Sequence, residues 1–265
     1  GSYVVDRLLG EGGFGAVYRV TDEKNDQLAY ALKIEKKSAK CKDPKLKMEV
    51  AILKTLQQRQ DSSSTKNSHF TALIDRGRRD WFYFVVMELL GSSLSELKRQ
   101  MAKKVFPLAT GLALGKQCLE AVEQLHRVGF IHRDIKPANF AIGRGEKKTH
   151  IYILDFGISR RFLNSKGVLK TPREKARFKG TIKFAPLACH RNQELSTKDD
   201  VEAWFYLLID LINPMGLPWS RIRDINEVKN IKERCRTGKG KERLFVEMPS
   251  AVASRLGQVM AYFDG

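Results

Sequence analysis

This chain of 265 residues has no long hydrophobic run. Its two richest apolar stretches are Trp81 to Leu90 and Ala203 to Ile212, and the charged residues Glu88 and Asp210 interrupt them. Both stay well short of the roughly 18 apolar residues that a membrane-spanning helix needs. A basic start followed by an apolar segment is also absent, so we expect neither a membrane partner nor a signal peptide.

Cysteines are few, and basic residues far outnumber acidic ones. The four cysteines (Cys41, Cys118, Cys189, Cys235) show no CxxC spacing, which argues against a zinc site and a disulfide framework. Free thiols favour a reducing compartment, the cytoplasm before the nucleus. The 48 Lys and Arg against 30 Asp and Glu give a net charge of +18, which suits nucleic acids, membrane surfaces or acidic protein substrates. Basic residues are not interleaved with aromatic ones along one face, so we expect no nucleic-acid partner.

The N-terminal part of the chain has the pattern of strands with one helix among them. Runs of β-type residues predict strands at Tyr3 to Leu9, Ala16 to Val20, Leu28 to Ile34, Phe70 to Ile74 and Trp81 to Met87. Asp43-Pro44 has the pattern of an N-cap followed by a first helical residue, and apolar residues at helical spacing come after it. A helix is therefore expected from Pro44 to about Arg59.

After Gly91 the pattern changes to helices. Apolar residues from Leu108 to His126 recur on one face of a long helix that is expected to end near Gly129. Asp200 opens a stretch that is apolar nearly all round as far as Ile212, which predicts a buried helix. We therefore expect an α+β protein with a small β-rich lobe over about residues 1–90, a larger helical lobe over about residues 91–265, and a cleft between them.

The segment Gly10-Glu11-Gly12-Gly13-Phe14-Gly15-Ala16-Val17 satisfies the pattern GxGxxGxV. Glycines have no side chain, so their backbone amides can approach phosphates closely. Two kinds of site use such a pattern: a dinucleotide-binding fold, in which Glu35 would be the ribose-binding acid, and a flap of two strands over a nucleotide. The dinucleotide site requires a helix at the glycines. Because Ala16 to Val20 has the composition of a strand, the flap is favoured.

Lys33 and Glu49 form a candidate pair. Lys33 ends the run Tyr30-Ala31-Leu32-Lys33, and taken alone it would be a solvated surface lysine. Glu49 lies three residues after Leu46 and four before Leu53, hence on the apolar stripe of its predicted helix. A carboxylate that faces a core is costly unless it is paired, and Lys33 is the partner that we predict for it.

Two further motifs carry acidic and amide side chains. Residues His132 to Asn139 match HRDxKPxxN at every specified position. Asp155-Phe156-Gly157 follows sixteen residues after Asn139, directly behind a short buried strand predicted at Ile151 to Leu154. A turn that merely happens to be rich in Asp and Asn does not explain both motifs in this order after Lys33 and Glu49.

With these motifs the chain resembles the eukaryotic protein kinases, from about Tyr3 to about Phe263. Lys136, two residues after Asp134, is typical of serine/threonine kinases. Within the family the segments Met87 to Gly91, Pro137 to Phe140 and Gly180 to Ala185 resemble the casein kinase 1 group. The segments His190 to Asn192 and Ile231 to Arg234 are most similar to its tau-tubulin kinase branch. The resemblance implies a single bilobal protein kinase domain over residues 1–265.

The resemblance also implies a reaction and the roles of its residues. The γ-phosphoryl group of ATP would pass to a Ser or Thr hydroxyl, with Asp134 as proton acceptor, Lys136 on the transferred group, and Asn139 and Asp155 as Mg²⁺ ligands. Lys33, fixed by Glu49, would bind the α- and β-phosphates. The remaining nucleotide contacts would come from Leu9, Gly10, Glu11, Gly12, Gly13, Phe14, Gly15, Ala16, Val17, Ala31, Met87, Glu88, Leu90 and Leu154.

Three expectations have alternatives. Met87 is expected as the gatekeeper of the nucleotide pocket, although a core methionine is an equally good explanation. Asp200 is expected either to accept backbone amides of the His132 to Asp134 loop or to act as a simple charge at a helix N-terminus. Thr181 is expected to contact Asp134 and Lys136, the alternative being a plain turn threonine.

The chain departs from the resembled family at three places. Leu187 follows Ala185-Pro186 at the position where most kinases have a glutamate that braces the activation segment. The casein kinase 1 group also lacks this glutamate. Ala141 replaces a larger residue at the floor of the adenine site. The chain stops at Gly265, before the last helices and the late arginine that we expect. A catalytically weak kinase fold that serves as a scaffold is therefore the alternative function.

Substrate preference is predicted from charge. In the resembled group, basic residues near the activation segment receive acidic or already phosphorylated side chains of the substrate. The corresponding residues here are Arg177, Lys179, Lys183, Arg221, Arg223, Lys229 and Lys232. The alternative is an ordinary solvated face. We expect a monomer that acts on protein substrates with Ser or Thr, acidic or cytoskeletal.

Overall fold

The structure, a computed structural model, describes residues 1–12, 15–38, 44–60, 68–164 and 166–264. The chain divides into two units. Unit 1 comprises Gly1–Ser92 and Ala141–Ser159, and unit 2 comprises Ser93–Phe140 and Arg160–Gly265. The expected division near residue 90 assigns Ala141–Ser159 to the larger lobe, whereas these residues cluster with the N-terminal strands.

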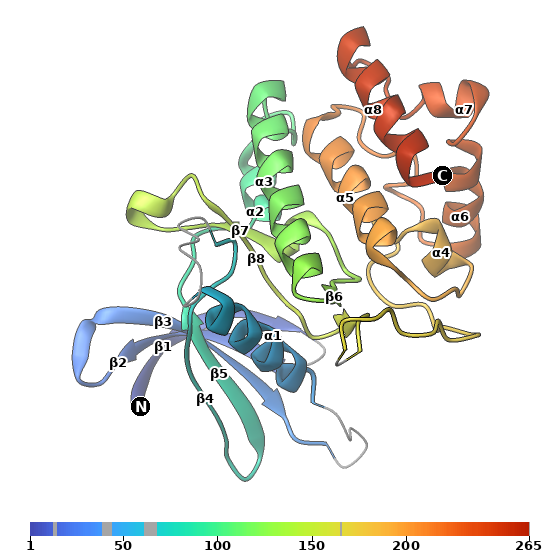
Figure 1. The fold of residues 1–265 in the computed structure, drawn as a ribbon. Helices are drawn as coiled ribbons and strands as arrows, with labels where there is room; N and C mark the ends of the chain where they lie inside the picture. Colours follow the sequence, from blue (N-terminus) through green and yellow to red (C-terminus); the bar gives the residue numbers. More distant parts are fainter. Residues whose placement is uncertain (13–14, 39–43, 61–67, 165, 265) are drawn as a thin grey trace. The chain divides into compact units, whose positions relative to one another are not determined.

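In the described part of unit 1, five antiparallel strands form a sheet in the order β1-β2-β3-β5-β4 (Figure 1). They are β1 (Tyr3–Gly12), β2 (Gly15–Asp22), β3 (Asn25–Lys36), β4 (Leu73–Arg78) and β5 (Phe82–Glu88). The predicted strands are confirmed except that β4 begins after Phe70. The ring of Phe70 packs against Phe156, and the carbonyl of His69 accepts the amide of Ile153, so this stretch is tied to β8 (Ile151–Ile153).

The glycine-rich segment joins β1 to β2. Gly12 pairs with Gly15 across the hairpin, while Gly13 and Phe14 lie outside the described residues. Gly15 has to be glycine, because a Cβ atom at this position would lie 1.8 Å from the carbonyl oxygen of Ile34. A strand rather than a helix follows the glycines, which excludes the dinucleotide-binding alternative.

Helix α1 (Lys45–Gln60) packs against the sheet at β3, β4 and β5, as Figure 1 shows. Its first amides are satisfied from the sheet: the carboxylate of Glu35 accepts the N–H groups of Lys45 at 3.1 Å and Leu46 at 2.8 Å. A carboxylate at this end is also favoured by the helix dipole. The ribose-binding role considered for Glu35 is therefore wrong. The predicted N-cap, Asp43, lies outside the described residues.

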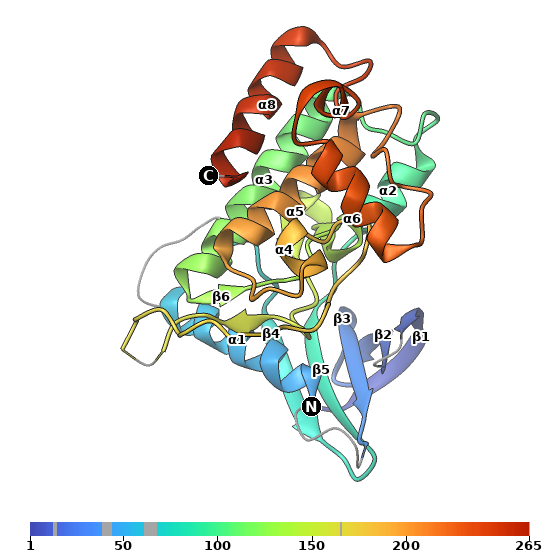
Figure 2. The ribbon, with the colours of Figure 1, turned by 90° about the vertical axis from the view of Figure 1, so that its right-hand side faces the viewer.

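Unit 2 is helical over most of its described residues (Figure 2). Its helices are α2 (Leu94–Gln100), α3 (Leu108–Arg127), α4 (Leu187–His190), α5 (Thr197–Ile212), α6 (Ile225–Arg234), α7 (Gly238–Glu242) and α8 (Ser250–Asp264). The two long helices that were predicted are confirmed as α3 and α5. The described residues also form two small strand pairs. β6 (Phe130–Ile131) pairs with β9 (Arg160–Arg161) in unit 2, whereas β7 (Phe140–Ile142) pairs with β8 and, except for Phe140, this second pair belongs to unit 1.

Helix α5 is the centre of the core of unit 2, where it contacts α3 and α8. Gly111 and Gly115 on α3 allow its close approach, because Cβ atoms there would lie 2.2 Å from Ile212 and 2.6 Å from Leu208. The indole N–H of Trp204 donates to the carbonyl of Gly115 at 2.8 Å. Small residues on one helix thus make room for large ones on the other.

The start of α5 differs from the prediction. The helix begins at Thr197, one turn before Asp200, because Ser196 caps it. The carboxylate of Asp199 accepts the backbone amide of Ser196 at 2.6 Å, as in a capping box. Asp200 therefore does not cap the helix, and its contacts are described with the site below.

None of the helices within the described ranges is long and apolar enough to cross a membrane. Three cysteines of the described residues, Cys118, Cys189 and Cys235, are buried and unpaired with one another. Cys41 lies outside these residues.

Candidate functional site

The residues of the sequence motifs form two clusters, one in each unit. In unit 1, the Nζ atom of Lys33 on β3 lies 2.7 Å from Oε2 of Glu49 on α1 and 3.1 Å from Oδ1 of Asp155. The predicted pairing of Lys33 with Glu49 is confirmed. Glu49 is buried, whereas the side chain of Asp155 is 52% exposed and can meet a ligand.

The charge of Lys33 is held by its carboxylate neighbours. Burial on its own lowers the pKa of a lysine, but the carboxylates of Glu49 and Asp155 outweigh it and raise the pKa of Lys33 above its usual value. Asp155 has a left-handed backbone with φ of 63°, a conformation that residues other than glycine seldom adopt. A fixed ammonium ion beside an exposed, strained carboxylate suits a ligand that brings both phosphate and metal.

Strand register places four of the predicted nucleotide residues on one face of the sheet. Val17 lies directly opposite Lys33, and Met87 lies directly opposite Ala31. Paired residues share a face, and so do residues two apart on one strand. Val17, Ala31, Lys33 and Met87 therefore line the same face. Met87 is buried there, which suits a gatekeeper and a core methionine alike.

The other predicted nucleotide residues that the structure describes lie elsewhere in unit 1. Leu9 sits at an irregularity of β1, between the pairs that Leu8 and Gly10 make with β2. The remaining described ones are Gly10, Glu11 and Gly12 at the end of β1, Gly15 and Ala16 at the start of β2, Glu88 at the end of β5, Leu90 after it, and Leu154 after β8.

In unit 2, Asp134 is the centre of a second cluster. The hydroxyl of Thr181 donates to Oδ1 of Asp134 at 2.8 Å, and the ammonium group of Lys136 lies 2.7 Å from Oδ2. Lys136 also donates to the hydroxyl of Thr181 at 3.0 Å. The amide nitrogen of Asn139 donates to the backbone carbonyl of Asp134 at 2.8 Å. The predicted contacts of Thr181 are thus confirmed, and the plain turn threonine is excluded.

Asp200 holds the backbone next to this cluster. One of its carboxylate oxygens accepts the amide of His132 at 2.7 Å, and the other accepts the amide of Arg133 at 2.9 Å. Nε2 of His126 lies 2.8 Å from the first oxygen. Burial would raise the pKa of Asp200, but the hydrogen bonds and the charge of the histidines hold it below its usual value. Of the two predictions for this residue, the contact with the loop amides is confirmed.

Backbone conformation fixes the loop that carries Asp134. Arg133 has φ of 71°, in the left-handed region. Gly180 has φ of 105°, and a Cβ atom there would lie 2.7 Å from the carbonyl of Arg133. Only glycine allows the two segments to come this close. Thr181 reaches Asp134 because the residue before it has no side chain.

Two of the predicted substrate-binding lysines have other partners. Lys232 is fully buried, so its prediction as a contact for acidic substrates is wrong. Lys183 lies 2.7 Å from Oδ1 of Asp210, whose other oxygen lies 2.6 Å from Lys98. The sequence reasoning missed Asp210, although a carboxylate in an otherwise apolar helix is the same signal that identified Glu49.

Known proteins resemble nearly the whole chain. A family model described as the protein kinase domain matches residues 3–261. A probable serine/threonine-protein kinase of Dictyostelium discoideum is 34% identical over 238 residues, which are 89% of this chain and 46% of that protein. A putative serine/threonine-protein kinase of Caenorhabditis elegans is 37% identical over 194 residues, 73% of this chain and 58% of that protein. A probable casein kinase I homolog of Encephalitozoon cuniculi is 33% identical over 254 residues, 91% of this chain and 76% of that protein.

The first two of these relatives are longer than the part that aligns. The chain spans 46% and 58% of their lengths, about half. The family model, in contrast, leaves only a few residues at either end unmatched. The mixed fold, with its strands in the N-terminal part and helices in the C-terminal part, agrees with that match. The chain belongs to the protein kinase domain family, among relatives that are serine/threonine-protein kinases.

Proposed function

We propose that the chain transfers the γ-phosphoryl group of ATP to Ser and Thr hydroxyls of protein substrates. The observation that carries this proposal is the cluster of Asp134, Lys136 and Thr181, in which a carboxylate, an ammonium ion and a hydroxyl lie within 3.0 Å of one another. Phosphoryl transfer asks a protein mainly to position groups and to neutralise charge. Family membership and the Lys33 cluster support the same reaction.

Each residue then has a role. Asp134 orients the substrate hydroxyl and accepts its proton, and Lys136 stabilises charge on the transferred group. Lys33, held by Glu49, binds the α- and β-phosphates. Residues 9–17 cover the phosphates, and Val17, Ala31, Met87 and Leu154 surround the adenine, whose edge meets the backbone of Glu88 and Leu90.

Asn139 and Asp155 fit the Mg²⁺ that accompanies ATP. Their amide and carboxylate oxygens are the hard ligands that Mg²⁺ prefers. Because the Nδ2 atom of Asn139 is used by the carbonyl of Asp134, Oδ1 is its ligand atom. When bound, the metal ions neutralise phosphate charge.

An ATP-turnover assay tests the proposal. Wild-type protein, Mg²⁺-ATP and a mixed library of Ser- and Thr-containing peptides should give labelled phosphopeptides. The Asp155→Ala variant should be slower by about a hundredfold or more, since it loses a charged ligand at the phosphates. Tight nucleotide binding by the wild type without any phosphopeptide would refute the proposal and favour the scaffold alternative, which none of the comparisons supports.

Within the family we place the chain in the casein kinase 1 group, near its tau-tubulin kinase branch. The motifs around Met87, Phe140 and Ala185 support this, together with the relative that is called a casein kinase I homolog. We further propose a single kinase domain that acts as a monomer in the cytoplasm or nucleus. Its substrates would be acidic, already phosphorylated or cytoskeletal proteins.

A basic pocket in unit 2 supports the acidic preference. The pocket has a volume of about 270 Å³ and lies beside the Asp134 cluster. Its lining includes Ser95, Lys98, Arg99, Lys104, Lys136 and Lys183. Asp210 neutralises part of this charge through its two lysine contacts. A single carboxylate leaves one positive charge on the pair of Lys98 and Lys183, and this charge, with the other cations of the pocket, attracts a carboxylate or phosphate of a peptide whose hydroxyl lies at Asp134.

The Lys183→Met variant should raise the KM for acidic peptides about tenfold, the effect of one charge-assisted hydrogen bond. The KM for neutral peptides should change less than twofold, because Asp210 keeps Lys98 as its partner and no charge is left unpaired. Peptide pairs that differ only in an acidic residue measure this. Lys170→Met, an exposed lysine elsewhere in the activation segment, is the matched control. Equal losses on acidic and neutral peptides would refute the idea.

A further inference from the structure

Residues Thr181 to Pro186 form a turn that belongs to no helix or strand. Within it, the carbonyl of Thr181 accepts the amides of Phe184 and Ala185, both at 2.9 Å. A segment without ladder hydrogen bonds depends on side chains to satisfy its other backbone groups. The side chains that do so here come from α5, α6 and the loop between them.

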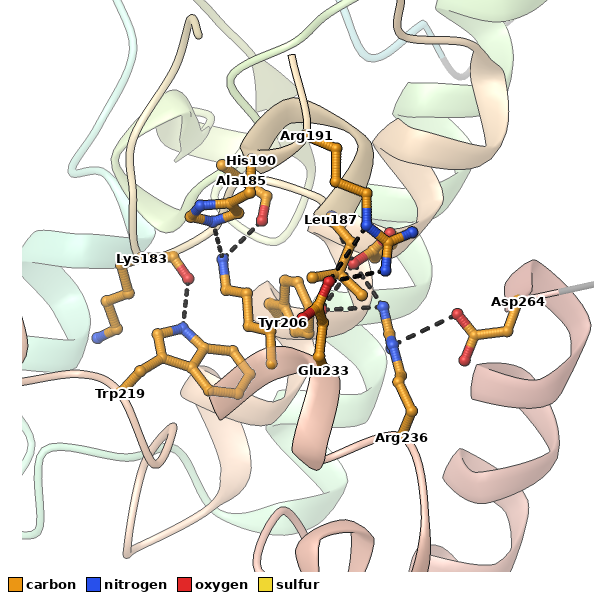
Figure 3. Close-up of polar contacts among 12 residues, drawn as sticks. Lys183, Ala185, Leu187, His190, Arg191, Tyr206, Trp219, Glu233, Arg236 and Asp264 are labelled. Carbon is orange, nitrogen blue, oxygen red and sulfur yellow. Dashed lines mark hydrogen bonds and ion pairs between the residues drawn. The ribbon is translucent and has the colours of Figure 1, made fainter. Parts of the chain in front are cut away.

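Lys232 of α6 provides the first contact. Its Nζ atom donates to the carbonyl of Ile182 at 2.9 Å. It also donates to the carbonyl of Ala185 at 2.6 Å and lies 3.1 Å from Nε2 of His190, two residues that Figure 3 labels. The residue has no exposed surface, and burial lowers the pKa of Lys232 to about 7. As an ammonium ion or as a neutral amine, the group has N–H donors for both carbonyls.

Two aromatic rings complete the surroundings of this lysine. Its Nζ atom lies 4.9 Å from the ring centre of Tyr206 and 5.2 Å from that of Trp219, distances typical of cation–π contacts. The indole N–H of Trp219 points to the carbonyl of Lys183 and donates to it at 2.7 Å (Figure 3). Three backbone carbonyls of the turn are therefore held by two side chains that pack on each other.

The far end of the turn is held by Glu202 of α5. Its Oε1 atom accepts the amide of Leu187 at 3.0 Å, the hydroxyl of Tyr206 at 2.7 Å and the guanidinium group of Arg236 at 2.5 Å. Arg236 in turn lies 3.4 Å from Asp264 at the end of α8 (Figure 3). The carboxylate of Glu202 thus accepts a backbone amide at Leu187, the position at which the family usually has a glutamate.

We propose that Lys232 and the Glu202–Arg236 pair are positioning residues for the protein substrate, an inference that rests on the proposed function. They hold the turn from both ends, and the turn carries the Thr181 hydroxyl that bonds to Asp134 and Lys136. An ion pair between Glu202 of α5 and Arg236, which follows the end of α6, thus replaces the missing glutamate. The nucleotide residues of unit 1 take no part in these contacts.

Kinetics of Lys232→Met test the inference. Methionine fills nearly the same space without an N–H donor, so the turn loses two of its contacts while the core keeps its volume. The kcat/KM for peptide should fall about 10- to 100-fold. The KM for ATP should change less than twofold. Arg234→Met, an exposed residue of the same helix, is the control and should behave as the wild type.

Hydrogen exchange gives a second readout that needs no activity. In Lys232→Met the amides of Phe184, Ala185 and Leu187 should exchange at least about tenfold faster, while those in the middle of α3 and α5 stay protected. Unchanged exchange at the three amides would overturn the inference. So would equal losses for peptide and ATP. A wild type that never forms phosphopeptides would instead count against the proposed function, and the exchange result would still decide whether Lys232 holds the turn.

Should Lys232→Met fail to fold, Trp219→Phe takes its place. This change removes the indole N–H that donates to the carbonyl of Lys183 and keeps an aromatic ring over Lys232. A fall of about three- to tenfold in kcat/KM for peptide, with the KM for ATP unchanged, is expected. Wild-type kinetics in this variant would contradict the inference.

Discussion

An Asp134→Asn variant should lose about two to four orders of magnitude in kcat, the usual contribution of a positioned general base. An amide cannot take up the proton of the substrate hydroxyl. The change also disturbs Lys136, which lies 2.7 Å from Oδ2 of the wild-type carboxylate. Asparagine keeps one oxygen for the hydroxyl of Thr181 but turns an NH₂ group towards the lysine, so these two donors repel each other. Steady-state kinetics with peptide and ATP measure the loss.

The result is informative because the substitution preserves shape. Asparagine has nearly the same volume as aspartate, so the variant should still fold cooperatively, with a thermal stability that is lowered only by the lost contact with Lys136. The KM for ATP should also be retained, since Lys33 and Asp155 are unchanged. Asp26→Asn, on an exposed part of β3, controls for the loss of one negative charge. A variant that retains more than about a tenth of the wild-type kcat would contradict the role of Asp134.

The sequence was informative where a residue and its partner obey a local rule. Glu49 was predictable because helical periodicity put its carboxylate on an apolar stripe, so that burial demanded a cation, and Lys33 was at hand. One segment of six residues contains Asp134, Lys136 and Asn139, so a single loop is enough to bring their side chains together. The hairpin at Gly12 and Gly15 followed from strand composition on both sides of the glycines.

Other features depend on partners that no local rule identifies. Lys232 resembles its neighbouring lysines in sequence, and only the fold shows that it is buried against the carbonyls of Ile182 and Ala185. Glu202 is a different case, because a glutamate in an apolar helix requires a partner. Helical periodicity predicts that the carboxylate of Glu202 is buried and needs a partner. It does not identify Arg236 and the amide of Leu187 as the partners. The start of β4 was misplaced because Phe70 packs against Phe156, a contact between segments far apart in the chain.

Asp200 should be the most important single carboxylate for the stability of unit 2. Asp200→Ala removes the acceptor for the amides of His132 and Arg133 and for His126, all within a buried region. Loss of one partner from such a buried polar group costs about 3 to 5 kcal/mol of unfolding free energy. Urea denaturation at pH 7 measures it. Asp200→Asn, which keeps one acceptor oxygen, should fall between the wild type and the alanine variant.

The dependence on pH separates the charge of Asp200 from its shape. Its folded-state pKa is lowered, so its stabilisation is complete above the unfolded-state pKa of about 3.9 and is lost as the pH falls through the folded value. The difference in unfolding free energy between the wild type and Asp200→Asn should therefore shrink as the pH falls below about pH 4. The neighbouring Asp199 provides a control of opposite sign, because burial raises its pKa. The unfolding free energy of the wild type should therefore rise relative to that of Asp199→Asn as the pH falls. If both aspartates gave the same pH dependence, their buried surroundings would not determine their charge.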